Sequence, residues 1–343
     1  MGASKRSKYF IAAVFTGYLA FCAGIFLFFE IQHFVRTPAD PLAEIQTFNV
    51  SPGETFRGIA ERLQRENIVE SAFKLRLYAR VKGLDVRIQA GEYALSAAQP
   101  PAALLEAMAS GRVRLHRVTV PEGYTLFQIA ALMDQAGLAE REAFIAAATD
   151  PETARRLGID APTLEGYLFP ETYLFPKQAS PETILSAMVA QFRKAFQPQW
   201  ETDAAKAGFT LHQVVTLASM IEKETGAGFE RPLIASVFHN RLKKNMRLES
   251  DPTVIYGIYR FDGNLTRQHL NEKTPYNTYR ISGLPPGPIA NPGADSLEAA
   301  VYPADTRFLY FVSKNDGTHV FSEDLPAHRS AVKKYQKEKG KSK

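Results

Sequence analysis

The sequence predicts an α+β protein with a single N-terminal membrane-spanning helix, an α/β subdomain and a larger mixed α+β domain. Three observations indicate this: a long uncharged run near the N-terminus, a strand–turn–helix pattern that occurs twice, and short strands scattered among helices. Regular alternation of strands and helices, which a doubly wound parallel sheet requires, is missing. The predicted segments are a tail (1–8), a membrane helix (9–29), a linker (30–46), a subdomain (47–116) and a larger domain (117–343).

The charge distribution argues against nucleic-acid binding. The 343 residues contain 41 Lys and Arg against 36 Asp and Glu, a net charge of +5, and the excess lies at the two ends. A nucleic-acid-binding fold concentrates its positive charge on one face, so the nearly neutral body excludes that class. The basic segment 333–343 reads as a solubilising end, or else as a contact for anionic lipid or an acidic partner.

Cysteine and histidine are too sparse for a metal or redox centre. Cys22 is the one cysteine, so no intramolecular disulfide and no CxxC site can form. The seven histidines include no pair spaced by four residues. We expect neither a metal ion nor another cofactor.

Residues 9–29 form the predicted membrane helix. They contain no charged side chain, and as a helix they span about 31 Å, close to the thickness of a bilayer core. Lys5, Arg6 and Lys8 precede the run, which predicts a cytoplasmic N-terminus and translocation of the rest. The alternative, a cleaved signal peptide, would have a shorter apolar region and a small-residue cleavage site. Phe21 before Cys22 disfavours a lipoprotein.

An internal repeat opens each of the two predicted domains. VSPGETFRGIA (50–60) recurs as VPEGYTLFQIA (120–130) at an offset of 70 residues. Each copy predicts a strand, a glycine turn and a helix capped by Thr55 or Thr125, and the second unit extends over 120–133. The shared pattern resembles the opening of LysM modules, which bind chitin-like and peptidoglycan glycans. A strand–turn–helix unit used twice for packing alone would give the same pattern.

The segment 164–176, LEGYLFPETYLFP, combines aromatic, leucine and proline residues with Glu165 and Glu171. Aromatic faces with a few carboxylates suit a sugar-binding groove, whereas the same composition suits a loop that fills the core. Composition alone favours the core loop.

The helix predicted over 211–224 carries the candidate for acid–base chemistry. Glu222 and Glu224 lie about 200° apart around its axis, so only one of them can enter a given pocket. Glu222 follows a run without charges, and a carboxyl at such a buried end is suited to proton donation. Two solvated glutamates flanking Lys223 would have the same spacing. Helix geometry alone does not decide between a catalytic glutamate and a solvated pair.

The C-terminal third combines a long loop with a hairpin and a basic final helix. The Gly- and Pro-rich loop 283–293 is long enough to suggest a functional role. Strand patterns over 308–312 and 318–322 flank Asn315-Asp316-Gly317, which predicts a hairpin turn.

Several motifs together resemble the MltG, or YceG-like, family of endolytic murein transglycosylases. They are LASMIEKET (217–225), FHNRL (238–242), DPTVIYG (251–257), TPYNTY (274–279) and GLPPGPIANPGADSLEAA (283–300), with EGYLFPETY (165–173) upstream. The resemblance implies a lyase of the cell inner membrane whose periplasmic YceG-like catalytic domain cleaves MurNAc–GlcNAc bonds inside nascent glycan strands and leaves 1,6-anhydroMurNAc ends. It implies Glu222 as the single general acid and then base.

Substrate-groove residues are assigned more loosely. Glu171, Asn240, Tyr276 and Asn277 are candidates to orient sugar groups, and Tyr256 and Tyr173 are candidates to stack on sugar faces. Each could equally be structural, and Arg241 is expected to form an ion pair rather than bind a peptide stem. The expected partners are peptidoglycan strands, the membrane and peptidoglycan synthases (penicillin-binding proteins).

Two other functions stay open at this stage. A non-enzymatic scaffold would bind glycan strands and position cell-wall synthases without cleaving them. A hydrolytic muramidase would need a second carboxyl about 5–9.5 Å from Glu222.

Overall fold

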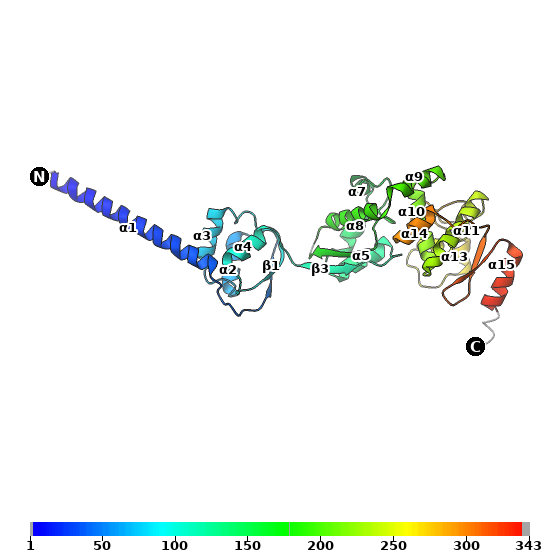
Figure 1. Ribbon diagram of the computed structural model, residues 1–343, viewed down its shortest axis with the longest axis horizontal. Coiled ribbons are helices and arrows are strands. Elements are labelled where there is room, and N and C mark those ends of the chain that lie inside the picture. Colours follow the sequence, from blue (N-terminus) through cyan, green and yellow to red (C-terminus); the bar gives the residue numbers. More distant parts are fainter. Residues whose placement is uncertain (1–2, 178, 338–343) are drawn as a thin grey trace. The chain divides into compact units, whose positions relative to one another are not determined.

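The computed structural model describes residues 3–177 and 179–337, and it has the predicted mixture of helices and short strands (Figure 1). The chain divides into two compact units, Met1–His116 and Arg117–Lys343. Each unit has its own hydrophobic core. From residue 338 on, the predicted basic tail lies outside the described residues.

Helix α1 (Ala3–Arg36) is longer than the predicted membrane segment. It continues through Glu30 because no helix-breaking residue occurs before Pro38, and the extended segment before the first strand is short. Phe34 and Val35 at its end are buried in the core of the first unit. The stretch Ala13–Arg36 is long and apolar enough to cross a membrane, a property that anchors and signal sequences share.

The rest of the first unit is a two-stranded antiparallel sheet with two helices between its strands and one after them. The strand pairing sets Gln46 opposite Leu95 and Val50 opposite Gly91. Phe48, Leu63 and Tyr93 are fully buried between the sheet and the helices. The elements are β1 (Gln46–Val50), α2 (Phe56–Arg65), α3 (Ala72–Lys82), β2 (Gly91–Leu95) and α4 (Pro101–Ala109).

The second unit begins with a similar succession of elements, with three helices instead of two between the paired strands. The strand β3 (Leu115–Thr119) pairs with β4 (Thr172–Pro176), and α5 (Leu126–Gln135), α6 (Arg141–Ala148) and α7 (Pro151–Arg156) lie between them in the chain. Both predicted caps are present, because Thr55 accepts from the amide of Gly58 and Thr125 from that of Gln128. The structural repeat is therefore longer than the sequence repeat and includes a returning strand.

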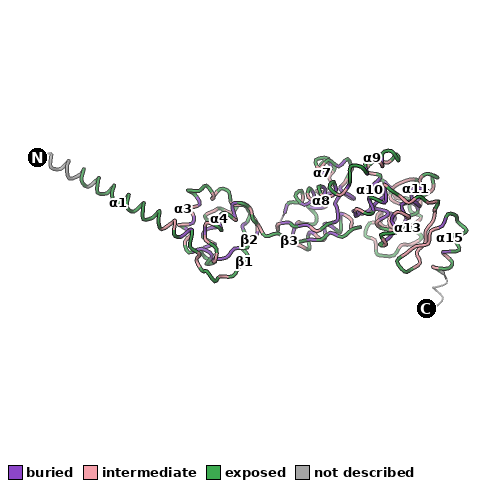
Figure 2. Tube along the Cα trace, in the orientation of Figure 1, coloured by how far each residue is buried: buried purple, intermediate pink, exposed green. Residues whose placement is uncertain are grey.

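The central element of the second unit is α10 (Leu211–Glu224), whose residues 214–221 are all buried (Figure 2). Helices α11 and α14 pack against it, and the predicted hairpin forms from β5 and β6. The remaining elements are α8 (Pro181–Ala195), α9 (Pro198–Lys206), a 3-10 turn (Gly228–Glu230), α11 (Arg231–Lys243), α12 (Asp251–Tyr256), α13 (Arg267–Asn271), α14 (Ala294–Val301), β5 (Tyr310–Ser313), β6 (His319–Ser322), α15 (Leu325–Val332) and a π-turn (Lys333–Lys337).

Gly166 allows the 164–176 segment to pass close to α10. Its φ is +88°, and a Cβ placed there would lie 2.5 Å from Pro288 Cγ and 2.7 Å from Val215 Cγ1. Both the left-handed backbone and the close approach therefore require glycine.

We expect Gly166→Ala to destabilise the second unit more than Gly137→Ala. Gly137 also has a positive φ (+65°), but its Cβ would meet no atom within 4 Å. Both variants incur about 1 kcal/mol of backbone strain, and Gly166→Ala adds about 1–3 kcal/mol of overpacking. Urea unfolding followed by the fluorescence of Trp200, the only tryptophan, measures the difference in this unit. Equal losses would show that the close contact relaxes without cost.

Candidate active site

The carboxylate of Glu222 is held at the end of α10 by two donors. Its Oε2 accepts a hydrogen bond from the backbone amide of Gly293 at 3.1 Å, and its Oε1 lies 3.4 Å from Arg231 Nη2. Gly293 immediately precedes α14, and Arg231 begins α11. Only 7% of the Glu222 side chain is exposed, so the two helices fix its orientation.

Arg231 is surrounded by three carboxylates. Besides Glu222, its guanidinium contacts Glu122 Oε2 and Asp295 Oδ2, each at 3.3 Å. Arg231 is buried, and it is a single cation beside three carboxyl groups. Partial burial and the neighbouring Glu222 raise the pKa of Glu122, against the opposing effect of Arg231.

Glu122 reaches this cluster from the glycine turn of the second repeat. The amide of Gly123 donates to the carbonyl of Asn291 at 2.9 Å, and Lys223 Nζ donates to the carbonyl of Gly123 at 3.2 Å. A Cβ at Gly123 would lie 3.5 Å from Glu222 Cγ. The turn therefore packs directly against the end of α10.

Glu165 is a buried carboxyl that contacts Leu126, the first residue of the helix after this turn. It accepts hydrogen bonds from the backbone amide of Leu126 at 3.0 Å, from Asn291 Nδ2 at 2.8 Å and from the Tyr256 hydroxyl at 3.1 Å. Burial outweighs these donors and raises the pKa of Glu165 to about 8. At neutral pH the protonated form prevails, so this carboxyl joins three segments without placing a full charge in the core.

Glu224 points to a different environment, as its position on the helix predicts. Its carboxyl accepts a hydrogen bond from the Ser250 hydroxyl at 2.5 Å. Burial, supported by the nearby Asp251, raises the pKa of Glu224 to about 7. The two glutamates of the helix end therefore do not share a pocket.

Tyr256 and Tyr276 lie together near this region. Their ring centroids are 4.9 Å apart, and both side chains are partly exposed. The Tyr256 hydroxyl is bound to Glu165, which links the ring pair to the buried network. Glu171 is exposed, and its carbonyl accepts from the amide of Val120, two residues before Glu122.

The structure does not bring Tyr173, Asn277 and Asn240 to the Glu222 cluster as free ligand groups. Tyr173 is buried, and its hydroxyl donates to the carbonyl of Phe169 at 2.6 Å. Asn277 is fully buried, and its amide donates to the carbonyls of His269 and Leu270 in α13 and of Glu272 directly after it. Asn240 donates to the carbonyls of Thr306 and Phe308. Their polar groups hold loops in place.

Arg241 has a structural role. Its guanidinium donates to the carbonyls of Leu309, Arg247 and Leu248, and it lies 3.4 Å from Glu249. This ion pair agrees with the expectation that Arg241 does not bind a peptide stem.

Sequence reasoning missed three members of the site. Glu122 stands in the repeat at a position where the first copy has Pro52, which is a signal that could have been used. Asn291 lies in the loop 283–293, which its length and composition marked as functional. Arg231 has no local signal, because an arginine at the start of a helix is unremarkable until the fold shows which carboxylates it meets.

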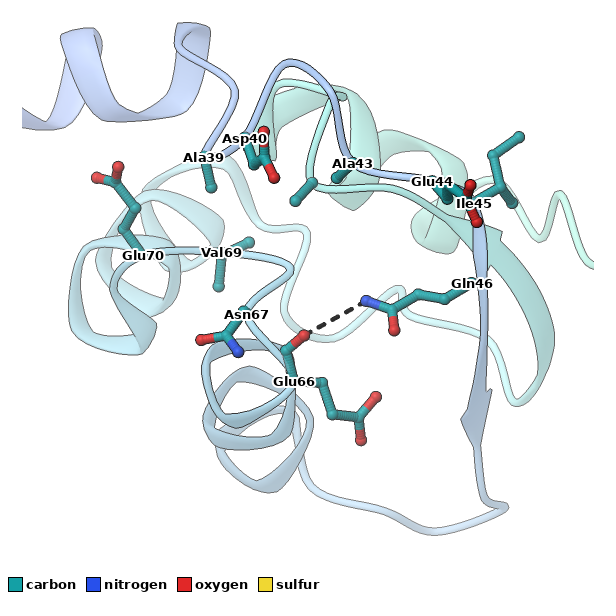
Figure 3. Close-up of a pocket in the computed structure, with 11 residues that line it drawn as sticks. Ala39, Asp40, Ala43, Glu44, Ile45, Gln46, Glu66, Asn67, Val69 and Glu70 are labelled. Carbon is teal, nitrogen blue, oxygen red and sulfur yellow. Dashed lines mark hydrogen bonds between the residues drawn. The ribbon is translucent and has the colours of Figure 1, made fainter.

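The described residues contain no group of three or more His, Cys, Asp or Glu arranged to hold a metal ion. A separate cavity of about 570 Å³ lies in the first unit, between the segment after α1 and the connection from α2 to α3 (Figure 3). It is lined by Asp40, Glu44, Glu66 and Glu70 among others, and none of the predicted site residues reaches it.

These features define a class of protein: a two-unit α+β chain with a candidate acid at the end of a buried helix. The model of the YceG-like family matches residues 48–334, so the chain belongs to that family. It is 35% identical over 303 residues to the endolytic murein transglycosylase of Bacillus subtilis (strain 168), covering 84% of each chain.

Two further relatives extend the comparison. The endolytic murein transglycosylase of Streptococcus pneumoniae (serotype 2, strain D39) is 30% identical over 298 residues, which cover 78% of this chain and 54% of that protein. The crystal structure of a yceG-like protein from Listeria monocytogenes is similar with a TM-score of 0.58 and 32% identity. The match covers 84% of this chain and 99% of that one.

The raised pKa of Glu165 predicts a pH-dependent stability. In the unfolded chain this carboxyl ionises near its ordinary pKa of 4.5, whereas in the folded chain it keeps its proton up to about pH 8. Between these values the folded state binds more protons, so its contribution to stability is present at low pH and is lost as the pH rises. One such group contributes a slope of up to about 1.4 kcal/mol per pH unit.

We expect Glu165→Gln to flatten this slope up to about pH 8, and Glu224→Gln to remove a separate slope that ends near pH 7. Urea unfolding followed by Trp200 fluorescence between pH 5 and pH 8.5 measures both. Curves for Glu165→Gln that run parallel to the wild type would show that Glu165 is ionised in the folded protein.

Proposed function

We propose that this protein is a membrane-anchored endolytic lytic transglycosylase acting on nascent peptidoglycan. The observation that carries the proposal is the Glu222 carboxylate, fixed at a buried helix end by Gly293 and Arg231. Membership in the YceG-like family and relatives named endolytic murein transglycosylase support the same reaction.

In this reaction Glu222 first donates its proton to the glycosidic oxygen of a MurNAc–GlcNAc bond. The C6 hydroxyl of the muramoyl sugar then attacks the anomeric carbon, and the Glu222 carboxylate removes the hydroxyl proton. The products are a strand with a free GlcNAc hydroxyl and a strand with a 1,6-anhydroMurNAc end. No water is consumed, so one carboxyl suffices where a hydrolase uses two.

Arg231 and Gly293 act as positioning groups in this proposal. The amide of Gly293 holds one oxygen of Glu222 and leaves the other beside Arg231, whose positive charge stabilises the carboxylate after proton transfer. Tyr256, Tyr276 and Glu171 keep exposed surface, and so does Asn240, whose amide binds two backbone carbonyls. We assign Tyr256 to a sugar face, and Tyr276 and Glu171 to the orientation of sugar polar groups.

One observation favours a second candidate, a hydrolytic muramidase. Glu122 is a second carboxyl next to Glu222, since both contact the same nitrogen of Arg231, and half of its side chain is exposed. In a hydrolase Glu122 would activate the attacking water. The identity of the new chain end separates the two reactions.

We further propose that α1 is an uncleaved anchor in the cell inner membrane, with a cytoplasmic N-terminus and a periplasmic catalytic unit. The uncharged run and the preceding Lys5, Arg6 and Lys8 support this orientation. The segments β1 to β2 and β3 to β4 both begin with the LysM-like sequence motif, and glycan binding by them is part of the proposal. Peptidoglycan synthases (penicillin-binding proteins) are the proposed partners, because termination of strand growth requires access to nascent strands.

Glu222→Gln should abolish the release of anhydro ends while leaving the fold intact. Removal of a general acid–base group costs about 10²–10⁴-fold in rate, and the amide still accepts from Gly293. Glu224→Gln, the same substitution two residues further on, is the matched control and should retain activity because its carboxyl faces Ser250. Mass spectrometry of un-crosslinked glycan strands treated with each protein reads the new ends.

Unchanged release of anhydro ends by Glu222→Gln would refute the assignment of the acid. Binding of glycan strands by the wild type without any cleavage, in membranes that contain the synthases, would favour a scaffold.

Glu122→Gln decides between the two reactions. For a transglycosylase we expect anhydro ends to remain the product, with a rate lowered by about tenfold or less, because only an electrostatic neighbour of Glu222 is lost. For a hydrolase, the wild type would give reducing ends that carry oxygen from solvent, and Glu122→Gln would lose them. Digestion in ¹⁸O-labelled water distinguishes these outcomes.

A further inference from the structure

The first unit presents an arginine-rich concave surface on α3, close to α1. A hollow of about 300 Å³ is lined by Arg57, Arg76, Arg80, Phe73 and Leu77, with Asp85 among its walls. We name these six residues the arginine face. They come from the start of α2, from one side of α3 and from the loop after α3.

Contacts with α1 fix the height of this face relative to the proposed membrane segment. Lys74, which follows Phe73, forms an ion pair with Glu30 at 2.7 Å and lies over the ring of Phe34. Figure 1 shows α3 beside the C-terminal end of α1, in agreement with their direct packing. Glu30 is the first charged residue after the uncharged run 9–29. If that run occupies the bilayer core, α3 begins at the level of the lipid headgroups.

The exposed groups of the arginine face suit a headgroup environment. The Phe73 side chain is 64% exposed, and aromatic rings are favoured at the boundary between hydrocarbon and headgroups. Arg76 and Arg80 are one helical turn apart and can bind phosphate through two parallel hydrogen bonds. Arg57 pairs with Glu61, but both side chains are well exposed, so this pair is weak enough to exchange for a lipid phosphate.

We propose that the arginine face binds the phosphate groups of anionic membrane lipids next to the anchor. Among the described residues, Arg76 and Arg80 lie beside Asp85 without forming a salt bridge, and Arg76 is near enough to Glu61 to lower the pKa of that exposed carboxyl. Exposed arginines with an exposed phenylalanine beside them fit a negatively charged surface with an apolar interior. Contact of α3 with the bilayer would hold the first unit at the membrane surface. The proposal rests on the proposed anchoring by α1 and adds a second, lipid-dependent contact.

The test uses the full chain with Trp200→Phe and Phe73→Trp, so that the one tryptophan reports on the arginine face. The protein is reconstituted into vesicles of brominated phosphatidylcholine, alone or mixed with phosphatidylglycerol at about one part in three. We expect bromine quenching in the mixed vesicles and much less in the neutral ones. Arg76→Gln with Arg80→Gln should lower the ratio of docked to undocked protein on the order of tenfold.

The matched control is Arg65→Gln with Arg112→Gln, which removes the same charge from exposed arginines of the same unit outside the arginine face. Equal quenching in neutral and anionic vesicles, or equal loss in both double variants, would overturn the proposal. Flotation of the chain with neutral vesicles measures anchoring by α1 separately. Loss of flotation refutes the anchor, whereas flotation without anionic-lipid-dependent quenching refutes only the arginine face.

Discussion

The buried carboxyl of Glu165 connects the parts of the second unit on which the site depends. It binds the first amide of α5, the side chain of Asn291 and the hydroxyl of Tyr256, groups that are separated by up to 165 positions in the numbering (Leu126 to Asn291). Burying a carboxyl without hydrogen-bond partners would cost folding free energy. The fold that buries Glu165 must therefore also bring these three segments together. Asn291 in turn binds the glycine turn that carries Glu122. Glu165 thus supports the turn through Asn291, and Lys223 binds the same turn directly from α10.

The charged groups around Arg231 differ from the Glu165 network because some of them are exposed to solvent. One guanidinium serves three carboxylates, and its partner Glu222 is buried while Glu122 and Asp295 reach solvent. The exposed acids can change their contacts with little cost because water can replace Arg231 as their partner, whereas Glu222 remains held by the amide of Gly293. The three acids at Arg231 therefore differ in how firmly they are held, and Glu222 is the one that is both buried and bound by a backbone amide.

The repeated strand–turn–helix unit shows that the same local turn conformation can occur in two different surroundings. Gly53 and Gly123 have nearly the same positive φ, +77° and +74°, and each is followed by a capping threonine. In the first unit the turn residue before the glycine is Pro52, and in the second it is Glu122. The conformation of the turn comes from glycine and threonine, so the preceding residue is free to serve the site in one copy alone.

The sequence by itself determined the fold class and most of the local structural elements of this protein. The α+β class, the apolar N-terminal helix, the two threonine caps, the C-terminal hairpin and the extent of α10 all follow from patterns within a few residues, because capping, turn geometry and helical periodicity act over that range. The separation of Glu222 from Glu224 follows from the helical repeat. Tertiary structure alone decided that Glu122, Arg231 and Asn291 meet at Glu222 and Glu165, and that Tyr173 and Asn277 turn inward. Those outcomes depend on which distant segments pack together and on which buried polar groups must be paired, and no local pattern encodes either.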